Sequence, residues 1–277
     1  DDSLKSVRIC VAAITAGVVC IAVMLGILSA AIYAENESGG SFIGLMYHQV
    51  LKDESRAGKY IITPDELESD LAYLSENGYV SVLPSQLVKI REQGGRLPEK
   101  TVVITFDDGY ETGLYYVVIN VVGSYTDEYS RINEEGKHLS YAYLTWNEIK
   151  KLSDSGYVEI GNHTYDMHSY NGDRNGCARK ENESDEQYRT VLYEDVARLS
   201  DKLQRVTGKR PVAFAYPFGS LYEGSAEIIG SAGISVFMTC CEQPCSMNRN
   251  GRIVINRYNR ESGRTARQIC EEFNNAF

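Results

Sequence analysis

The chain has 277 residues, enough for one large domain or two small ones, and 43% apolar and 24% charged residues are ordinary for a globular protein. Its formal net charge of −10, without any run of Lys or Arg, argues against nonspecific nucleic-acid binding and favours a neutral or weakly charged ligand. Seven cysteines form no regular framework for disulfides. Cys241 and Cys245 could bridge or bind metal, but no second Cys/His pair lies near them.

The N-terminal part contains a long uncharged segment, residues 9–34. It is longer than the roughly 20 residues that a membrane-spanning helix needs. Lys5 and Arg8 precede it, so the positive-inside rule predicts a cytoplasmic N-terminus and an extracellular remainder. A signal peptide cleaved near residues 29–31 is the alternative, in which the protein is secreted. Both interpretations carry residues 35–277 across the membrane.

Beyond a cytoplasmic stub and anchor over 1–34 and a flexible linker over 35–41, we predict a single domain over 42–277. Apolar strands alternate there with amphipathic helices. The predicted strands are 42–47, 101–106, 117–123, 158–160, 211–216, 234–238 and 253–256. The predicted helices begin at capping boxes 63–66, 145–148 and 184–187 or cover 224–232 and 265–273. This alternation predicts a parallel α/β sheet or barrel, with its site at the carboxyl ends of the strands.

Two adjacent carboxylates, Asp107 and Asp108, directly follow the predicted strand 101–106 and precede Gly109. Neighbouring carboxylates repel each other unless a cation lies beside them. Adjacent side chains also point in different directions, so one can bind a metal ion while the other faces a bound water. An ordinary Asp-Asp-Gly turn is the alternative explanation.

Two of the four histidines of the chain, His163 and His168, lie five residues apart just after the predicted strand 158–160. Two imidazoles and one carboxylate are a usual ligand set of catalytic zinc, and they leave a position for water. Either histidine alone would more simply be a surface or core residue. The sequence therefore predicts that Asp107, Asp108, His163 and His168 converge on one divalent metal ion.

A third cluster, YPFG at 216–219, follows the predicted strand 211–216. Its Pro and Gly impose a sharp turn. Such a turn can aim a backbone N–H at a developing oxyanion. A plain connection between strand and loop explains the pattern equally well.

TFDDGY at 105–110, NHTYDMH at 162–168 and YPFG at 216–219 resemble, in this order, the first three motifs of the polysaccharide deacetylases with a NodB-type domain, carbohydrate esterase family 4. The resemblance covers roughly residues 42–260. It implies a distorted (β/α) barrel with one divalent metal ion, for which Zn²⁺ is favoured and Co²⁺, Ni²⁺ and Fe²⁺ are alternatives. It also implies a hydrolase that removes N-acetyl groups from an extracellular or cell-wall polysaccharide containing N-acetylglucosamine.

The resemblance assigns separate roles to the site residues. Asp107 would be the general base, and Asp108, His163 and His168 would bind the metal ion. The backbone N–H of Phe218 would help to form the oxyanion hole. The polysaccharide and, through residues 9–34, the membrane are the expected partners, nucleic acid is not, and the oligomeric state stays open.

The general acid is expected on the N-terminal side. Many members of the family use a histidine of a late Leu-x-His motif, but no histidine follows His168 here. YHQV at 47–50 instead resembles the YHxV motif of the poly-N-acetylglucosamine deacetylase branch. That resemblance implies His48 as the general acid; a histidine that caps a barrel strand is the alternative.

Two positions depart from the pattern of the family. The third motif usually begins with an arginine that orients the catalytic Asp, but Ala215 stands there; Arg257 or Arg260 could replace it. In addition, only residues 107–116 connect the predicted strands 101–106 and 117–123. A parallel crossover normally needs a dozen residues or more and a helix. We therefore expect either a different pairing of the second strand or a lost barrel helix, which would expose apolar surface.

Two other functions stay open at this point. A catalytically impaired relative that binds glycan at the cell surface fits the short crossover, but it would need neither Asp107 nor His48. Another metal hydrolase, such as a phosphoesterase, would need further carboxylate ligands or a second metal ion. Tyr110, Tyr165 and Tyr216 lie beside the motifs and either stack on sugar rings or pack in the core.

Overall fold

The computed structural model describes residues 38–109, 116–134, 143–170, 174–248 and 251–275. The predicted membrane anchor at 9–34 lies outside these ranges. Among the helices that the structure describes, none combines the length and the apolar character needed to cross a bilayer.

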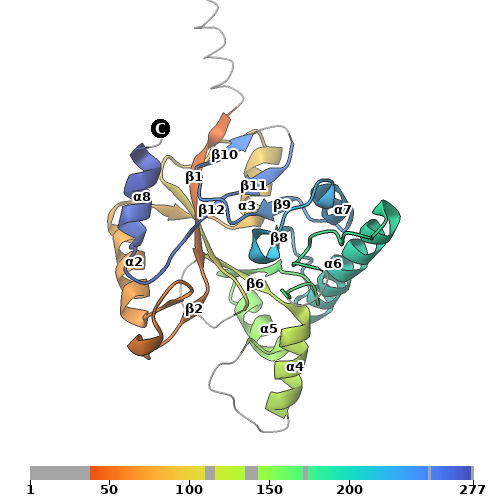
Figure 1. Ribbon diagram of the computed structural model, residues 1–277. Coiled ribbons are helices and arrows are strands. Elements are labelled where there is room, and N and C mark those ends of the chain that lie inside the picture. The colour runs from red at the N-terminus through yellow and green to blue at the C-terminus, as the bar shows by residue number, and fades with distance from the viewer. Residues whose placement is uncertain (1–37, 110–115, 135–142, 171–173, 249–250, 276–277) are drawn as a thin grey trace, which may run out of the picture.

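Ten of the described strands form one sheet that curls into a nearly closed barrel (Figure 1). Parallel strands follow one another around it in the order β1 (Ser38–Tyr47), β5 (Thr101–Phe106), β6 (Val117–Val121), β7 (Val158–Asn162), β8 (Ala213–Ala215), β9 (Val236–Met238) and β11 (Ile253–Ile255). After Asn256 the chain continues as β12 (Arg257–Asn259), which pairs in parallel with β1 and so brings the end of the sheet back to its start. The predicted distorted (β/α) barrel is confirmed.

The remaining strands are short additions to this barrel. The strand β10 (Cys245–Asn248) runs antiparallel to β1, β4 (Val80–Ser81) pairs with β5, and β2 (Gln49–Val50) pairs only with β3 (Ile61–Ile62). Short 3₁₀ turns cover Glu54–Arg56 and Pro217–Gly219.

Helices lie around the outside of the barrel (Figure 1). They are α2 (Pro64–Glu76), α3 (Pro84–Glu92), α4 (Gly123–Glu134), α5 (Trp146–Asp154), α6 (Asp185–Thr207), α7 (Ser225–Ser231) and α8 (Ala266–Asn275). The three predicted capping boxes are confirmed: Thr63, Thr145 and Ser184 each accept a hydrogen bond from the backbone N–H three residues later. These bonds satisfy N–H groups that a helix start otherwise leaves without a partner.

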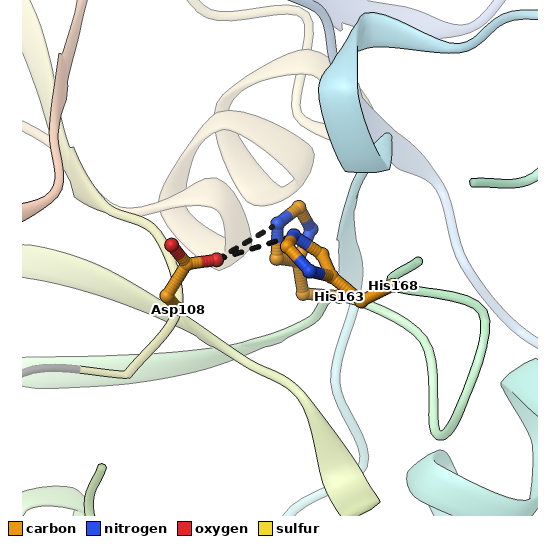
Figure 2. Close-up of side chains that lie close together, drawn as sticks. All are labelled: Asp108, His163 and His168. Atoms are coloured by element: carbon orange, nitrogen blue, oxygen red, sulfur yellow. Dashed lines mark ion pairs between the residues drawn. The ribbon is translucent and has the colours of Figure 1, made fainter. Parts of the chain in front are cut away.

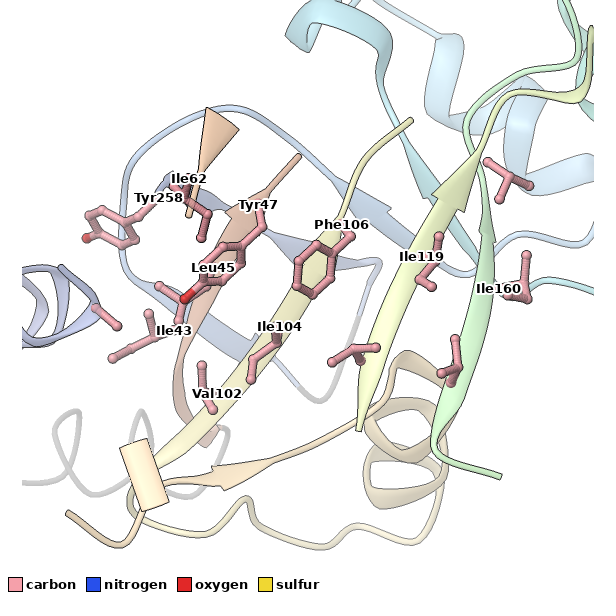
Figure 3. Packing of buried hydrophobic residues seen from close by; sticks show 14 of the residues in the cluster. Ile43, Leu45, Tyr47, Ile62, Val102, Ile104, Phe106, Ile119, Ile160 and Tyr258 are labelled. Atoms are coloured by element: carbon pink, nitrogen blue, oxygen red, sulfur yellow. The ribbon is translucent and has the colours of Figure 1, made fainter. Parts of the chain in front are cut away.

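Buried side chains on the two faces of the barrel strands form separate clusters, because successive residues of a strand point to opposite faces. Alternate residues of β1 and β5, such as Leu45 and Ile104, join a cluster with apolar side chains of α2, α5 and α8, part of which Figure 3 shows. Residues on the opposite face of the same strands, such as Phe42 and Val103, belong to a second cluster with Val118, Ala213, Ala215 and Met238. Burial of each such side chain contributes about 1.5–3 kcal/mol, so the strands are fixed from both sides.

The short connection 107–116 does not change the strand order, so the expectation of a different pairing is wrong. β5 and β6 pair in parallel, with Ile104 opposite Val117 and Phe106 opposite Ile119. Ten residues reach roughly 33 Å when extended, whereas a return along a five-residue strand takes only about 17 Å. The expected exposure of apolar barrel surface is also wrong, because these four residues are at most 2% exposed.

Several element boundaries differ from the predictions. β1 begins at Ser38, inside the segment 35–41 that was expected to be a linker. The predicted strand 117–123 ends at Val121, and Gly123 already begins α4, which the sequence did not predict. A Cβ atom at Gly123 would lie 2.5 Å from the Tyr165 ring, so only glycine allows this close passage. All described cysteines are free, and Cys241 and Cys245 form no bridge.

Candidate metal and catalytic site

All six predicted site residues line one cleft of about 770 Å³. They come from the carboxyl ends of four barrel strands, as the fold class predicts. His48 follows β1, the two aspartates follow β5, the two histidines follow β7, and Phe218 follows β8.

Three of these residues form a group that could hold a metal ion, and their ligand atoms all lie within 4.8 Å of one another. Asp108 Oδ1 lies 3.2 Å from His168 Nε2 and 3.6 Å from His163 Nε2 (Figure 2). Tetrahedral zinc ligands at about 2.1 Å from the ion lie roughly 3.4 Å apart. Both the donor types and their spacing therefore fit one divalent ion.

A hydrogen bond on the side of the ring away from Asp108 fixes the orientation of His163. Its Nδ1 lies 2.9 Å from the carbonyl oxygen of Ala215, which can only accept a hydrogen bond. The proton therefore resides on Nδ1 and leaves the lone pair of Nε2 for a ligand, as in many metal sites. Burial lowers the pKa of His163 to about 4, although Asp107 nearby opposes this shift. His163 is thus neutral at neutral pH, which is the state that binds metal.

His168 is held mainly by aromatic contacts. Its ring lies 4.5 Å from the Phe218 ring and 5.8 Å, edge to face, from the Tyr125 ring. The Tyr125 hydroxyl also donates a hydrogen bond of 2.9 Å to the carbonyl oxygen of His168. Tyr125 belongs to α4, so this unpredicted helix supports the second histidine of the candidate metal group.

Helix α6 holds the segment between the two histidines. The carboxylate of Asp195 accepts hydrogen bonds from the backbone N–H groups of Tyr165 and Asp166, at 2.7 and 2.8 Å. The side-chain amide of Asn162 donates to the carbonyl oxygen of Val196 at 2.9 Å. A loop fixed by charge-assisted bonds of this kind keeps its ligands in place before an ion binds.

Backbone strain is concentrated at the site. Among the described residues, those other than glycine with a positive φ are Asp108, Thr164 and Phe218, at 67°, 73° and 57°. Such a conformation costs about 1–3 kcal/mol for each residue and persists only where the surroundings enforce it. One residue of each of the three sequence motifs has this strained conformation. The strain indicates that the position of the side chain or backbone N–H at the site matters more there than local stability.

Asp107 lies buried in the barrel interior, where Arg257 Nη1 and Asn120 Nδ2 both donate to its Oδ1 at 2.6 and 2.8 Å. Neither of these hydrogen bonds uses Oδ2. Burial raises the pKa of Asp107, but the Arg257 guanidinium and the neighbouring His163 outweigh it and hold that pKa well below its usual range. The carboxylate is therefore ionised at neutral pH.

The choice between the two candidate arginines is now clear. Arg257 contacts Asp107 directly, and its Nε also donates to the carbonyl oxygen of Thr239 at 3.0 Å. Arg260 instead pairs with Asp70 at 2.5 Å, on the other face of the sheet. Arg257 thus takes the place of the arginine that is missing at Ala215.

His48 lies at the same cleft, and its ring packs against the Tyr60 ring with centroids 4.7 Å apart. Its Nδ1 is buried without a hydrogen-bond partner among the described residues. Burial lowers the pKa of His48, while Asp107 and Asp108 act in the opposite direction. Since Nδ1 makes no bond to the backbone, the side chain does not cap a strand through this atom.

Phe218 occupies the tight turn after β8. Gly219 and Ser220 donate backbone hydrogen bonds to Tyr216 and Pro217, at 3.1 and 2.9 Å. Gly219 is itself left-handed, and a Cβ atom there would lie 3.0 Å from Cys240. The turn brings Phe218 to the cleft; its role in an oxyanion hole stays a prediction.

Some residues of the site were not singled out in the sequence. Asn120 stands in the apolar run VVINVVG, and a lone polar residue in a buried strand was the available signal. Asp195 carried no local signal, because its partners lie about 30 residues away. Of the tyrosines beside the motifs, Tyr165 and Tyr216 are buried and pack in the core, while Tyr110 lies outside the described residues.

Residues 94–237, slightly more than half of the chain, match the family model described as polysaccharide deacetylase. The chain is 25% identical over 229 residues to the poly-β-1,6-N-acetyl-D-glucosamine N-deacetylase of Escherichia coli strain K12, covering 72% of this chain and 34% of that protein. It is 22% identical over 236 residues to the Staphylococcus aureus strain MRSA252 protein of the same name, covering 79% and 77%. The chain thus spans about a third of the length of the E. coli relative. These names agree with the branch that YHQV indicated.

Solved structures support the same fold. A de-N-acetylase from Aggregatibacter actinomycetemcomitans superimposes with a TM-score of 0.69 at 24% identity, covering 83% of this chain and 99% of that chain. The IcaB structure from Ammonifex degensii gives 0.63 at 24% identity, covering 84% and 97%. At this identity the likeness concerns the fold alone. With the barrel, the order of the motifs and the family match together, this chain belongs to the polysaccharide deacetylase family.

Proposed function

We propose that the chain is a metal-dependent hydrolase that removes N-acetyl groups from a polysaccharide containing N-acetylglucosamine and releases acetate. The observation that carries this proposal is the pairing of two arrangements in one cleft. An ionised Asp107 is held by Arg257, and beside it lies the three-ligand group of Asp108, His163 and His168. The names of the relatives favour a β-1,6-linked glycan as the substrate.

Asp108, His163 and His168 would hold the divalent ion. Two imidazoles and a carboxylate favour Zn²⁺, while Co²⁺, Ni²⁺ and Fe²⁺ accept the same donors. When bound, such an ion supplies Lewis-acid polarisation and lowers the pKa of a coordinated water. The hydrogen bond from Nδ1 to the Ala215 carbonyl oxygen orients the His163 ring so that its unprotonated Nε2 can bind the ion.

The protein groups around the cleft would divide the proton transfers. Asp107 accepts a proton from the water that adds to the acetyl carbonyl carbon, while Arg257 and Asn120 hold its other oxygen. The N–H of Phe218 donates to the oxygen that becomes negative. His48 donates a proton to the sugar nitrogen as the carbon–nitrogen bond breaks. One amide and one water thus give one amine and one acetate.

The protein would act outside the cell. The uncharged segment 9–34, preceded by Lys5 and Arg8, supports a single-pass anchor with residues 35–277 on the extracellular side, or a cleaved signal peptide. Protease treatment of intact cells tests this location, because it should remove the domain of an exported protein but spare a cytoplasmic one.

Acetate release from a β-1,6-linked N-acetylglucosamine oligomer tests the proposed activity. We expect the purified full chain to release acetate, to lose this activity with a chelator and to regain it with zinc. A chain that binds zinc and the oligomer but releases no acetate would instead be a glycan-binding relative. The short crossover no longer favours that alternative, because the barrel strands beside it are buried.

A further inference from the structure

A series of aromatic rings leads out of the candidate metal site. The Phe218 ring lies 4.5 Å from the ring of the ligand His168 and 4.2 Å from the ring of Tyr170. Tyr170 is 65% exposed and lines the cleft, although Phe218 covers part of it. The exposed ring of Tyr170 is therefore connected to His168 through two ring contacts.

The position of Phe218 is maintained against a local energetic preference. Its φ of 57° is one that glycine adopts freely and a bulky side chain rarely does. The side chain is also 38% exposed, so core packing does not explain it. An exposed aromatic residue in a strained conformation beside a catalytic site indicates a role in contact with a ligand.

The cleft is also lined by other aromatic and polar groups. Tyr60 packs against His48, and the ammonium of Lys59 lies 5.2 Å from the Tyr60 ring. Gln49, Glu242 and Asn259 also line the cleft. Its volume of about 770 Å³ is within the range of small-ligand sites, and Tyr170 lines it together with the candidate catalytic residues.

We propose that Tyr170, backed by Phe218, is a sugar-binding platform that stacks against the pyranose next to the one that carries the reacting N-acetyl group. The proposal rests on the function proposed above and adds a binding subsite to it. The face of an aromatic ring is negative and attracts the weakly positive C–H groups that line one face of a pyranose. A substrate of at least two sugar units uses the platform, whereas a small acetyl ester does not reach it.

The test compares two substrates in matched variants. We expect Tyr170→Ala to lower kcat/KM for the N-acetylglucosamine oligomer, relative to kcat/KM for para-nitrophenyl acetate, by roughly two- to tenfold. Tyr170→Phe keeps the ring and should keep the ratio. Tyr193→Ala removes a tyrosine that is 42% exposed on α6, away from the cleft, and should change neither substrate. An unchanged ratio in Tyr170→Ala would overturn the proposal.

Binding of the oligomer to the Asp107→Asn protein separates this proposal from the proposed activity. We expect calorimetry to show that adding Tyr170→Ala weakens that binding by the same factor, whether or not the chain turns over substrate. Equal affinity with and without the Tyr170 ring would contradict the platform even in an active enzyme. Absence of acetate release together with Tyr170-dependent binding would refute the activity and retain the platform.

Discussion

Asp107 and Asp108 are neighbours in the chain, but they belong to two differently organised regions. In the barrel interior, Asp107 Oδ1 receives hydrogen bonds from the buried side chains of Arg257 and Asn120. In the cleft, Asp108 Oδ1 faces two imidazole nitrogens, and the ligand group includes no positively charged side chain. The negative charge of Asp107 is balanced by the Arg257 guanidinium, whereas the group around Asp108 fits a cation.

This difference explains how one site can keep a base and bind a metal ion. The negative charge of Asp107 is set by the barrel, so it does not depend on the ion for its ionisation. The geometry of the ligands is set by the loops after β5 and β7, with support from α4 and α6. Changes around Asp107 should therefore affect folding and turnover, and changes in the group of Asp108, His163 and His168 should affect metal affinity.

The largest effect is expected from the two fully buried arginines. Removal of one partner from a buried ion pair costs about 3–5 kcal/mol, because the other charge is left unpaired. Both Arg257→Met and Arg260→Met should lose stability on this scale in urea unfolding, since each breaks such a pair. Only Arg257→Met should also abolish acetate release by the folded fraction. Equal loss of turnover in Arg260→Met would show that the interior pair has no specific role.

A pH titration of stability comes next and concerns the cleft. In the metal-free protein the pKa of His163 is about 4, below its ordinary value of 6.5. Between these values the unfolded chain binds more protons, so acid favours unfolding. The stability advantage of the native chain over His163→Asn should therefore shrink by about 3 kcal/mol from pH 7 to pH 4.

The comparison with His163→Asn is needed because Asp195 titrates in the same range. Burial raises the pKa of Asp195 to about 6, which acts in the opposite direction and is common to both proteins. Unfolding curves of both chains, measured at each pH with a chelator, give the difference directly. A difference that does not change with pH would contradict the buried neutral state of His163.

The support of the histidine loop by α6 should matter for metal affinity. Asp195→Ala removes the acceptor of two backbone N–H groups between the histidines. We expect a loss of about 1.5–3 kcal/mol in stability and a roughly tenfold weaker zinc affinity, measured by competition with a coloured chelator. Asp201→Ala is the matched control, because Asp201 on the same helix pairs with the exposed Arg210. If both variants bind zinc equally well, the loop is not held by Asp195.

The smallest effect on stability is expected for Asn120→Leu. The change removes a hydrogen-bond donor to Asp107, which destabilises the protein by about 1.5–3 kcal/mol. It also removes the buried Asn120 Oδ1 that lacks a partner, which stabilises the protein by about 1–3 kcal/mol. The two contributions nearly cancel in urea unfolding. The kcat should still fall by roughly tenfold, while KM and zinc affinity stay unchanged. An unchanged kcat would show that Arg257 alone positions Asp107.

The sequence predicted the barrel and the site because both depend on local signals. Polar motifs follow apolar strands, and the carboxyl ends of parallel strands meet at one edge, so the strand pattern was enough to place Asp107, Asp108 and His163 together. His48 was added only by the resemblance of YHQV to a family motif. The capping boxes at Thr63, Thr145 and Ser184 likewise fixed helix starts.

The remaining features depend on contacts between distant segments. Arg257 and Arg260 are three residues apart, and only the pairing of β12 with β1 decides which one reaches Asp107. Helix α4 begins at Gly123, with only Val122 between it and the end of β6, and valine is not a residue type that favours helix caps. The ten-residue connection is shorter than typical crossovers, which contain a helix, but an extended chain of that length is sufficient.

The most direct measurement of the central claim is the zinc content and acetate release of Asp107→Asn and Asp108→Asn, prepared in parallel with the native chain. We predict that Asp107→Asn retains one zinc ion per chain and releases no acetate, because the base is lost while the ligands remain. Asp108→Asn should lose both zinc and turnover. Native turnover in Asp107→Asn, or loss of zinc from it while Asp108→Asn keeps its ion, would contradict the division of this site into an interior base and a cleft metal group.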